Sequence, residues 1–283
     1  MHCDNKYLYL LYYIFFFGLK KMDKIKINKI TKHLLNKRFN KYYIDNSDLE
    51  LVPNSQEEAY LIQNKVHSLL NSDFDRPVGK KIGCTTNVMQ SYLKIDHPCA
   101  GTIRKSNCYK SGCSLNTKKY IKVGVECEIA VKLAKNLPFS ESYKKKDIYE
   151  YVESVFPAIE IVDDRYSNWE DFTANHLIAD DFFSSGCILG SKVSKVDFNQ
   201  LDSLKGNMYI NNKKIGEGLA SHILGHPLNA LVWLSGRRDI IGSLIPKNSI
   251  ILLGSLVETY WVTKGDQVKI NIEGMESISV NFV

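Results

Sequence analysis

Residues 123–131 read VGVECEIAV, and they place Glu126 and Glu128 inside a run that otherwise has the composition of a buried β-strand. Successive side chains of a strand face opposite sides, so the two glutamates share one face with Gly124 and Ala130. At ~3.3 Å per residue the two carboxylates are expected side by side, ~6.6 Å apart along the strand. Such a pair forms half of a site for a hard cation.

A third carboxylate, Glu160, interrupts the apolar run in FPAIEIVDDRY, residues 156–166. A buried carboxylate is costly unless it is paired or binds a metal. Three carboxylates that leave coordination positions open suit Mg²⁺ or Mn²⁺. The alternative is that the Glu-x-Glu pattern marks the solvated face of an antiparallel sheet, and its spacing alone leaves both interpretations open.

Outside this strand, the pattern of apolar and turn-forming residues predicts an α+β fold. Two amphipathic helices are expected at 25–43 and 55–70, the second with a Ser55 cap and Glu58 completing a capping box. After Gly79, short apolar segments broken by Gly, Pro, Asn and Asp indicate a β-rich region. Strands are predicted at 79–84, 120–133, 157–163, 186–190, 207–216, 249–257, 267–273 and 277–282.

Turns and one further helix are predicted between these strands. The pairs Asn211-Asn212 and Glu273-Gly274 predict turns, and Pro227 opens a helix that includes the apolar residues up to Leu234. His226, just before that helix, is interpreted as a capping or packing residue rather than a general base. A chain of 283 residues with 44% hydrophobic residues can bury one sizeable core.

Charge and cysteine content exclude several classes of function. The net charge is +6, but residues 1–45 carry +7, which leaves −1 for the rest of the chain. A near-neutral body lacks the basic surface that nucleic-acid binding requires. Seven cysteines without a regular framework favour a reducing, cytoplasmic compartment. Cys108 and Cys113 could form half of a zinc site, but free thiols are favoured.

The N-terminal run YLYLLYYIFFFGL, residues 7–19, is thirteen residues long and falls short of the ~20 that span a bilayer. Its positive flank follows it, unlike that of a signal peptide. We therefore expect residues 1–21 to be a dispensable tail, with Met22 as a plausible start; a membrane anchor is disfavoured and organellar targeting stays open. The predicted division is this tail, an N-terminal helical region at 22–75 and a catalytic domain at 76–283.

Several segments, in fixed order from about residue 50 onward, resemble one enzyme superfamily. They are EEAYLIQ (57–63), VGKKIGCTT (78–86), GVECEIAV (124–131), PAIEIVDDR (157–165), LIADDFFSSGCILG (177–190), LGHPLNALVWL (224–234) and LLGSLVETYWVTKGDQV (252–268). The chain resembles the fumarylacetoacetate hydrolase superfamily, in its branch of 2-keto-4-pentenoate hydratases and 4-oxalocrotonate decarboxylases. The resemblance implies a mixed β-sheet roll of the fumarylacetoacetase C-terminal-like type with peripheral N-terminal helices.

The resemblance also assigns roles. It implies that Glu126, Glu128 and Glu160 bind the divalent metal, and that Lys81 is the active-site lysine. Asp96 matches a position where the family often has an acid near the substrate. We expect the pKa of Lys81 to be lowered toward working pH beside a metal, which would suit proton transfer or the orientation of water.

Two segments depart from typical hydratases at the substrate end of the site. Residues 179–185 read ADDFFSS where those enzymes read ADNASSG, and the segment GSLTPP is GSLVET here. Ser184, Ser255 and Leu256 lie in these segments and are expected to contact substrate. Neither segment offers a cation for a second substrate carboxylate, although Arg104 or Arg165 could reach it.

These roles imply a metal-dependent hydratase that adds water to a 2-hydroxy-2,4-dienoate of the 2-oxopent-4-enoate type. The product would be a 4-hydroxy-2-oxo acid, and Mg²⁺ or Mn²⁺ the cofactor. The alternatives are a 4-oxalocrotonate-type decarboxylase, an acylpyruvate hydrolase or a non-catalytic partner subunit. A homo-oligomer is expected, with a small 2-oxo acid as substrate and no nucleic-acid or membrane partner.

Overall fold

The computed structural model describes residues 23–72, 75–194 and 196–283. The apolar N-terminal run and the tail predicted at 1–21 lie outside these residues. Among the helices of the described residues, none is long and apolar enough to cross a membrane.

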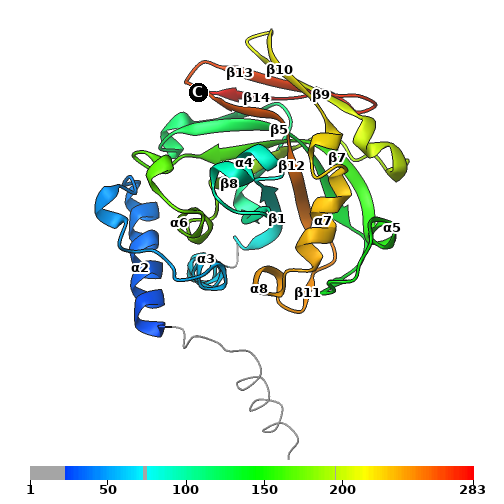
Figure 1. Cartoon of the computed structure of the whole chain (residues 1–283). Coiled ribbons are helices and arrows are strands. Elements are labelled where there is room, and N and C mark those ends of the chain that lie inside the picture. Colours follow the sequence, from blue (N-terminus) through cyan, green and yellow to red (C-terminus); the bar gives the residue numbers. More distant parts are fainter. Residues whose placement is uncertain (1–22, 73–74, 195) are drawn as a thin grey trace, which may run out of the picture.

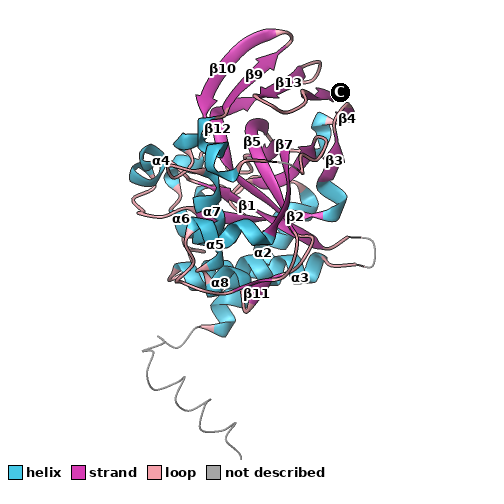
Figure 2. Cartoon of the chain, turned by 90° about the vertical axis from the view of Figure 1, so that its right-hand side faces the viewer, coloured by secondary structure: helices cyan, strands magenta, loops and turns pink. Residues whose placement is uncertain are grey.

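A seven-stranded mixed sheet forms the centre of the molecule (Figures 1 and 2). Its order is β2-β1-β12-β5-β7-β8-β3. The strand bounds are β1 Pro77–Gly83, β2 Cys99–Arg104, β3 Cys108–Lys110, β5 Val123–Leu133, β7 Val152–Asp163, β8 Ser184–Leu189 and β12 Ile250–Trp261.

The sheet curls into a roll, because β2 at one edge also contacts β8 near the other. The Ser184 hydroxyl of β8 donates to the Thr102 carbonyl of β2 at 3.0 Å. Three residues before Ser184, the carboxylate of Asp181 accepts from the Thr102 amide at 2.8 Å. A small group of buried apolar residues packs inside the roll; its members are Ile103, Ala130, Ala158, Cys187 and Leu252.

A second sheet of five strands packs beside the roll and lies at the top of Figure 2. Its order is β10-β9-β13-β14-β4, and a separate pair, β11 and β6, completes the strands described. The bounds are β4 Cys113–Leu115, β6 Leu137–Pro138, β9 Lys205–Ile210, β10 Lys213–Leu219, β11 Leu244–Ile245, β13 Gln267–Ile272 and β14 Ile278–Phe282.

Helices cover the roll, and the N-terminal pair α2 and α3 packs at its lower side in Figure 1. Ser55 caps α3 as predicted, but only half of the capping box forms, because the Glu58 carboxylate accepts from the Asn54 amide instead of the Ser55 amide. The helix bounds are α2 Lys24–Asn40, α3 Gln56–Leu70, α4 Asn87–Tyr92, α5 Lys145–Ile148, α6 Ala174–Ala179, α7 Pro227–Ser235 and α8 Arg238–Ile241.

The α+β prediction is confirmed, with differences in detail. The predicted strand 207–216 is a hairpin, in which Asn211 and Asn212 occupy the turn with φ values of 50° and 67°. The sequence missed β2, whose six residues CAGTIR are all buried. Strands with both faces buried lack the alternation that sequence patterns detect, and the small Cys, Ala and Gly weaken the apolar signal further.

Candidate metal centre and active site

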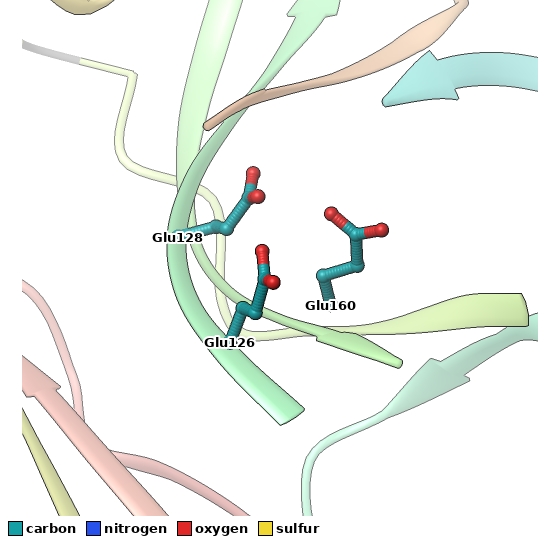
Figure 3. Close-up of side chains that lie close together, drawn as sticks. All are labelled: Glu126, Glu128 and Glu160. Atoms are coloured by element: carbon teal, nitrogen blue, oxygen red, sulfur yellow. The ribbon is translucent and has the colours of Figure 1, made fainter. Parts of the chain in front are cut away.

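The three predicted carboxylates converge inside the roll (Figure 3). Glu126 and Glu128 project from the same face of β5, and Glu160 lies directly opposite Glu126 on the neighbouring strand β7. One oxygen from each residue lies within 4.8 Å of the others. Glu128 and Glu160 are buried, whereas Glu126 is half-buried and marks the more open side of the cluster.

Backbone and hydroxyl donors orient two of these carboxylates. The Gly254 amide donates to Glu128 Oε2 at 3.0 Å, and the Thr259 hydroxyl donates to Glu126 Oε1. Gly254 has a φ of 126°, and a Cβ there would lie 2.8 Å from the Thr85 side chain. Only glycine therefore allows the β12 backbone to present this amide to Glu128.

The carboxylate oxygens that lack a hydrogen-bond partner indicate whether the cluster suits a metal. Glu128 Oε1 and Glu160 Oε2 are buried and have no hydrogen-bond partner among the described residues. Buried polar atoms of native proteins are rarely left without partners, so their lone pairs point to a further ligand. An all-oxygen donor set with three potential negative charges fits a hard divalent cation.

The proximity of the three carboxylates also changes their acidity. Burial, with a further contribution from the charge of Glu160, raises the pKa of Glu126 to about 7. Burial raises the pKa of Glu128 well above its ordinary value, and the charges of Glu160 and Glu126 add to that rise. The cluster resists carrying three negative charges unless a cation compensates them.

Lys81 of β1 provides one positive charge at the cluster. Its Nζ lies 3.0 Å from Glu160 Oε1, and the side chain is 3% exposed. Burial alone would lower its pKa, but the Glu160, Glu126 and Glu128 carboxylates outweigh that effect and raise it. Without a metal these carboxylates therefore favour the ammonium form of Lys81, and the lowered pKa expected beside a bound metal stays a prediction.

The neighbouring Lys80 faces away from the carboxylates. Its Nζ donates to Thr102 Oγ1 at 2.9 Å and to Gln63 Oε1 at 3.3 Å. Burial lowers the pKa of Lys80 to about 8. The two lysines thus alternate across β1, as the geometry of a strand requires.

The other predicted site residues do not bond to the cluster within the described part of the chain. Asp96 is exposed in the loop between α4 and β2. The Ser255 hydroxyl bonds to the carbonyls of Cys127 and Val257. Leu256 is buried against glycines of β9 and β10, and Ser184 bonds to the β2 backbone. Their roles toward substrate stay predictions.

Ser184 and Ser185 instead line a cavity of about 290 Å³ together with Arg38, Arg104 and Arg165. The guanidinium groups are already paired: Arg104 with Asp75, and both Arg38 and Arg165 with Asp180. The segment itself holds no cation, as its sequence indicates, and Arg104 and Arg165 do reach it in the fold, together with Arg38. Among the described residues, Arg165 pairs with Asp180 rather than with the adjacent Asp163 or Asp164.

His226 and the cysteines have structural roles outside the cluster. His226 Nδ1 accepts from the Leu228 amide at 3.1 Å and caps α7, as interpreted from sequence. Cys108 and Cys113 are free thiols, and Cys108 lies 3.5 Å from Cys187 rather than beside Cys113. Within the described residues, the three glutamates are the grouping of side chains able to hold a metal.

The family model for the fumarylacetoacetate (FAA) hydrolase C-terminal domain matches residues 103–283. The chain belongs to this family. It is 30% identical to the 2-hydroxyhexa-2,4-dienoate hydratase of Comamonas testosteroni over 80% of this chain and 86% of that protein. It is also 30% identical to the 2-oxo-hept-4-ene-1,7-dioate hydratase of Escherichia coli over the same shares.

Solved structures of FAA hydrolase family relatives share the fold. The 4-oxalocrotonate decarboxylase from Pseudomonas putida G7, complexed with magnesium and adipate, has a TM-score of 0.86 at 23% identity. That comparison covers 93% of this chain and 99% of the decarboxylase. The predicted family and its hydratase and decarboxylase branch are confirmed, and the mixed β-roll is the expected fold.

The groups that orient the carboxylates, Gly254 and Thr259, were not predicted from the sequence. Gly254 interrupts the apolar run IILLGSLV and could have been noticed as a point of close backbone approach. Thr259 carries no local signal, because its relation to Glu126 depends on the pairing of β12 with β5 across a register shift.

The raised pKa values of Glu126 and Glu128 predict that Mn²⁺ affinity rises with pH around neutrality. With a pKa of about 7, Glu126 binds a proton increasingly as the pH falls below that value, and Glu128 retains its proton to higher pH. A metal must displace these protons, which weakens binding by up to about tenfold per pH unit for each proton. Calorimetry from about pH 6 to about pH 8, in buffers of different ionisation enthalpy, measures affinity and proton release. A constant affinity without proton release would contradict this result.

Proposed function

We propose that the chain is a metal-dependent hydratase, a lyase that adds water to a 2-hydroxy-2,4-dienoate and yields a 4-hydroxy-2-oxo acid. The observation that carries this proposal is the convergence of three carboxylates and one lysine inside the roll of an enzyme family whose similar members are named hydratases.

Glu126, Glu128 and Glu160 would hold a divalent cation, Mg²⁺ or Mn²⁺. Solved relatives support this assignment, since the 4-oxalocrotonate decarboxylase is complexed with magnesium and a fumarylpyruvate hydrolase from Pseudomonas aeruginosa with Mn²⁺. When bound, the cation supplies a Lewis acid that holds the carboxylate and 2-oxo oxygens of the substrate and stabilises negative charge developing there. Substrate would approach from the side of Glu126, the least buried of the three carboxylates.

Lys81 would deliver a proton to the substrate. As an ammonium ion 3.0 Å from Glu160 it is a donor, suited to protonating the carbon that accepts a proton when the dienol becomes a ketone. The resulting unsaturated ketone accepts water at its β-carbon. Asp96, Ser184, Ser255 and Leu256 are kept as candidates for the substrate end.

A 4-oxalocrotonate-type decarboxylase is the second candidate. The observation that favours it is the cavity with three arginines beside Ser184 and Ser185, since a substrate with a second carboxylate needs a cationic partner. The existing pairs of these arginines with Asp75 and Asp180 argue against it, because that charge is already compensated.

Turnover distinguishes the candidates. With Mg²⁺ present, 2-hydroxypenta-2,4-dienoate should be converted to 4-hydroxy-2-oxopentanoate, detected by loss of dienoate absorbance and by product analysis. Rapid release of carbon dioxide from 2-oxo-3-hexenedioate, without hydration of the five-carbon dienoate, would establish the decarboxylase instead. Absence of both activities would favour a non-catalytic partner subunit.

A further inference from the structure

The aromatic ring of Phe182 lies beside the Lys81 ammonium. The centroid of the Phe182 ring lies 5.0 Å from Lys81 Nζ. A Cβ added at Gly83 would lie 3.0 Å from a carbon of this ring and 3.3 Å from Lys81 Nζ. Phe182 is only 5% exposed, so the ring, the ammonium and the Gly83 backbone are packed together.

The turn that carries this ring is strained and held firmly. Asp181, Phe182 and Phe183 have φ values of 72°, 47° and 62°. Left-handed conformations of residues other than glycine are costly and persist only when their surroundings enforce them. The Phe182 amide donates to the Leu177 carbonyl at 2.7 Å, and the Asp181 carboxylate lies 2.8 Å from His67 Nε2. The position of the ring is therefore fixed in advance.

Phe183 offers an internal comparison. It occupies the same turn with the same left-handed backbone, and its ring packs against Tyr166, Trp169 and the Phe182 ring, with centroids 5.8 Å, 6.0 Å and 5.8 Å apart. Of the two rings, Phe182 is therefore the one that meets the ammonium of the site.

We propose that Phe182 determines substrate specificity by restricting the site to 2-oxo acids whose tail is short and uncharged. This inference rests on the proposed function, in which the 2-oxo acid end of the substrate lies at the glutamates and Lys81 protonates a carbon further along; the proposal adds that the tail continues past Lys81 toward Phe182. The ring occupies space beside the ammonium, whose nearest carboxylate is Glu160. Because Glu160 already pairs with that ammonium, a tail carboxylate pressed against the phenyl ring would lose water and would have to compete with Glu160 for the cation, which is unfavourable.

Two ligands of equal carbon number test this role without any turnover. Calorimetry on the full chain with saturating Mn²⁺ compares 2-oxopentanoate with 2-oxoglutarate, which differs by its terminal carboxylate. The unmodified protein should bind 2-oxopentanoate more tightly. Phe182→Leu should shift the ratio of the two dissociation constants toward 2-oxoglutarate by about tenfold, a change typical of removing a wall from an apolar pocket. Phe182→Met provides a second replacement should the leucine variant not fold.

Phe183→Leu is the matched control, because it makes the same change in the same turn away from Lys81. It should leave the ratio unchanged. An equal shift in both variants, or no shift in a folded Phe182 variant, would overturn the role of Phe182 while leaving the proposed function intact. Failure of the unmodified protein to bind either ligand would overturn the proposed function together with this inference.

Discussion

Replacing Glu128 with glutamine is expected to stabilise the metal-free protein while weakening Mn²⁺ binding by about 100-fold or more. Glu128 is completely buried, and burial together with its acidic neighbours disfavours its charged form. The amide keeps the shape of the side chain and can still accept from Gly254. It removes the charge, however, and can donate to Glu160, so the free energy of unfolding should rise by roughly 1–3 kcal/mol at neutral pH.

Thermal unfolding without metal and Mn²⁺ titration by calorimetry measure the two effects separately. Glu153→Gln is a suitable control, because Glu153 lies on the same strand as Glu160 but pairs with Lys132 in a partly exposed position. That variant should keep its metal affinity and change stability by less than about 1 kcal/mol. A lower stability of metal-free Glu128→Gln would mean that the carboxylate serves the packing of the roll.

Replacing Lys81 with methionine is expected to lower kcat/KM by about 10²- to 10⁴-fold, the usual contribution of a positioned proton donor. Methionine preserves much of the apolar stem but has no proton to give. Mn²⁺ affinity should be retained or increase, because a positive charge 3.0 Å from Glu160 is removed. Steady-state kinetics on the dienoate and metal titration of the same preparation check both effects.

Lys80→Met is the matched comparison, since it makes the same change one residue earlier on the opposite face of β1. It removes the contacts to Gln63 and Thr102 and should reduce stability far more than kcat/KM. Equal losses of kcat/KM in the two variants would show that Lys81 acts only through the folding of β1.

The sequence allowed the three glutamates to be picked out because each breaks a local pattern that can be read without the fold. Glu126 and Glu128 are two residues apart and therefore face the same side of one strand, and Glu160 interrupts an apolar run. The pairing of Glu126 with Glu160 depends on the register between β5 and β7, which no local pattern specifies. The charges around Lys81 also come from other strands, so the pKa rise that they cause in the metal-free cluster could not be inferred from its sequence neighbours.

The substrate end was the least predictable part. In β12 the pairing with β5 shifts register around Ser255 and Val257. At such irregularities the alternation of faces no longer tells which side chain points into the roll. The left-handed turn at 181–183 contains no glycine, the residue that usually marks such a conformation in a sequence. The position of Phe182 could therefore not be inferred from its neighbours.

The placement of β1 between β2 and β12 has a consequence for how the protein folds. Lys81 lies opposite Leu252 in the parallel pairing of these strands. About 170 residues separate the two positions, and contacts so distant in sequence are slow to form. The antiparallel strands β5 and β7, by contrast, are close neighbours in the sequence. During synthesis the acidic strands can therefore meet early, whereas the lysine reaches them only after β12 has emerged from the ribosome.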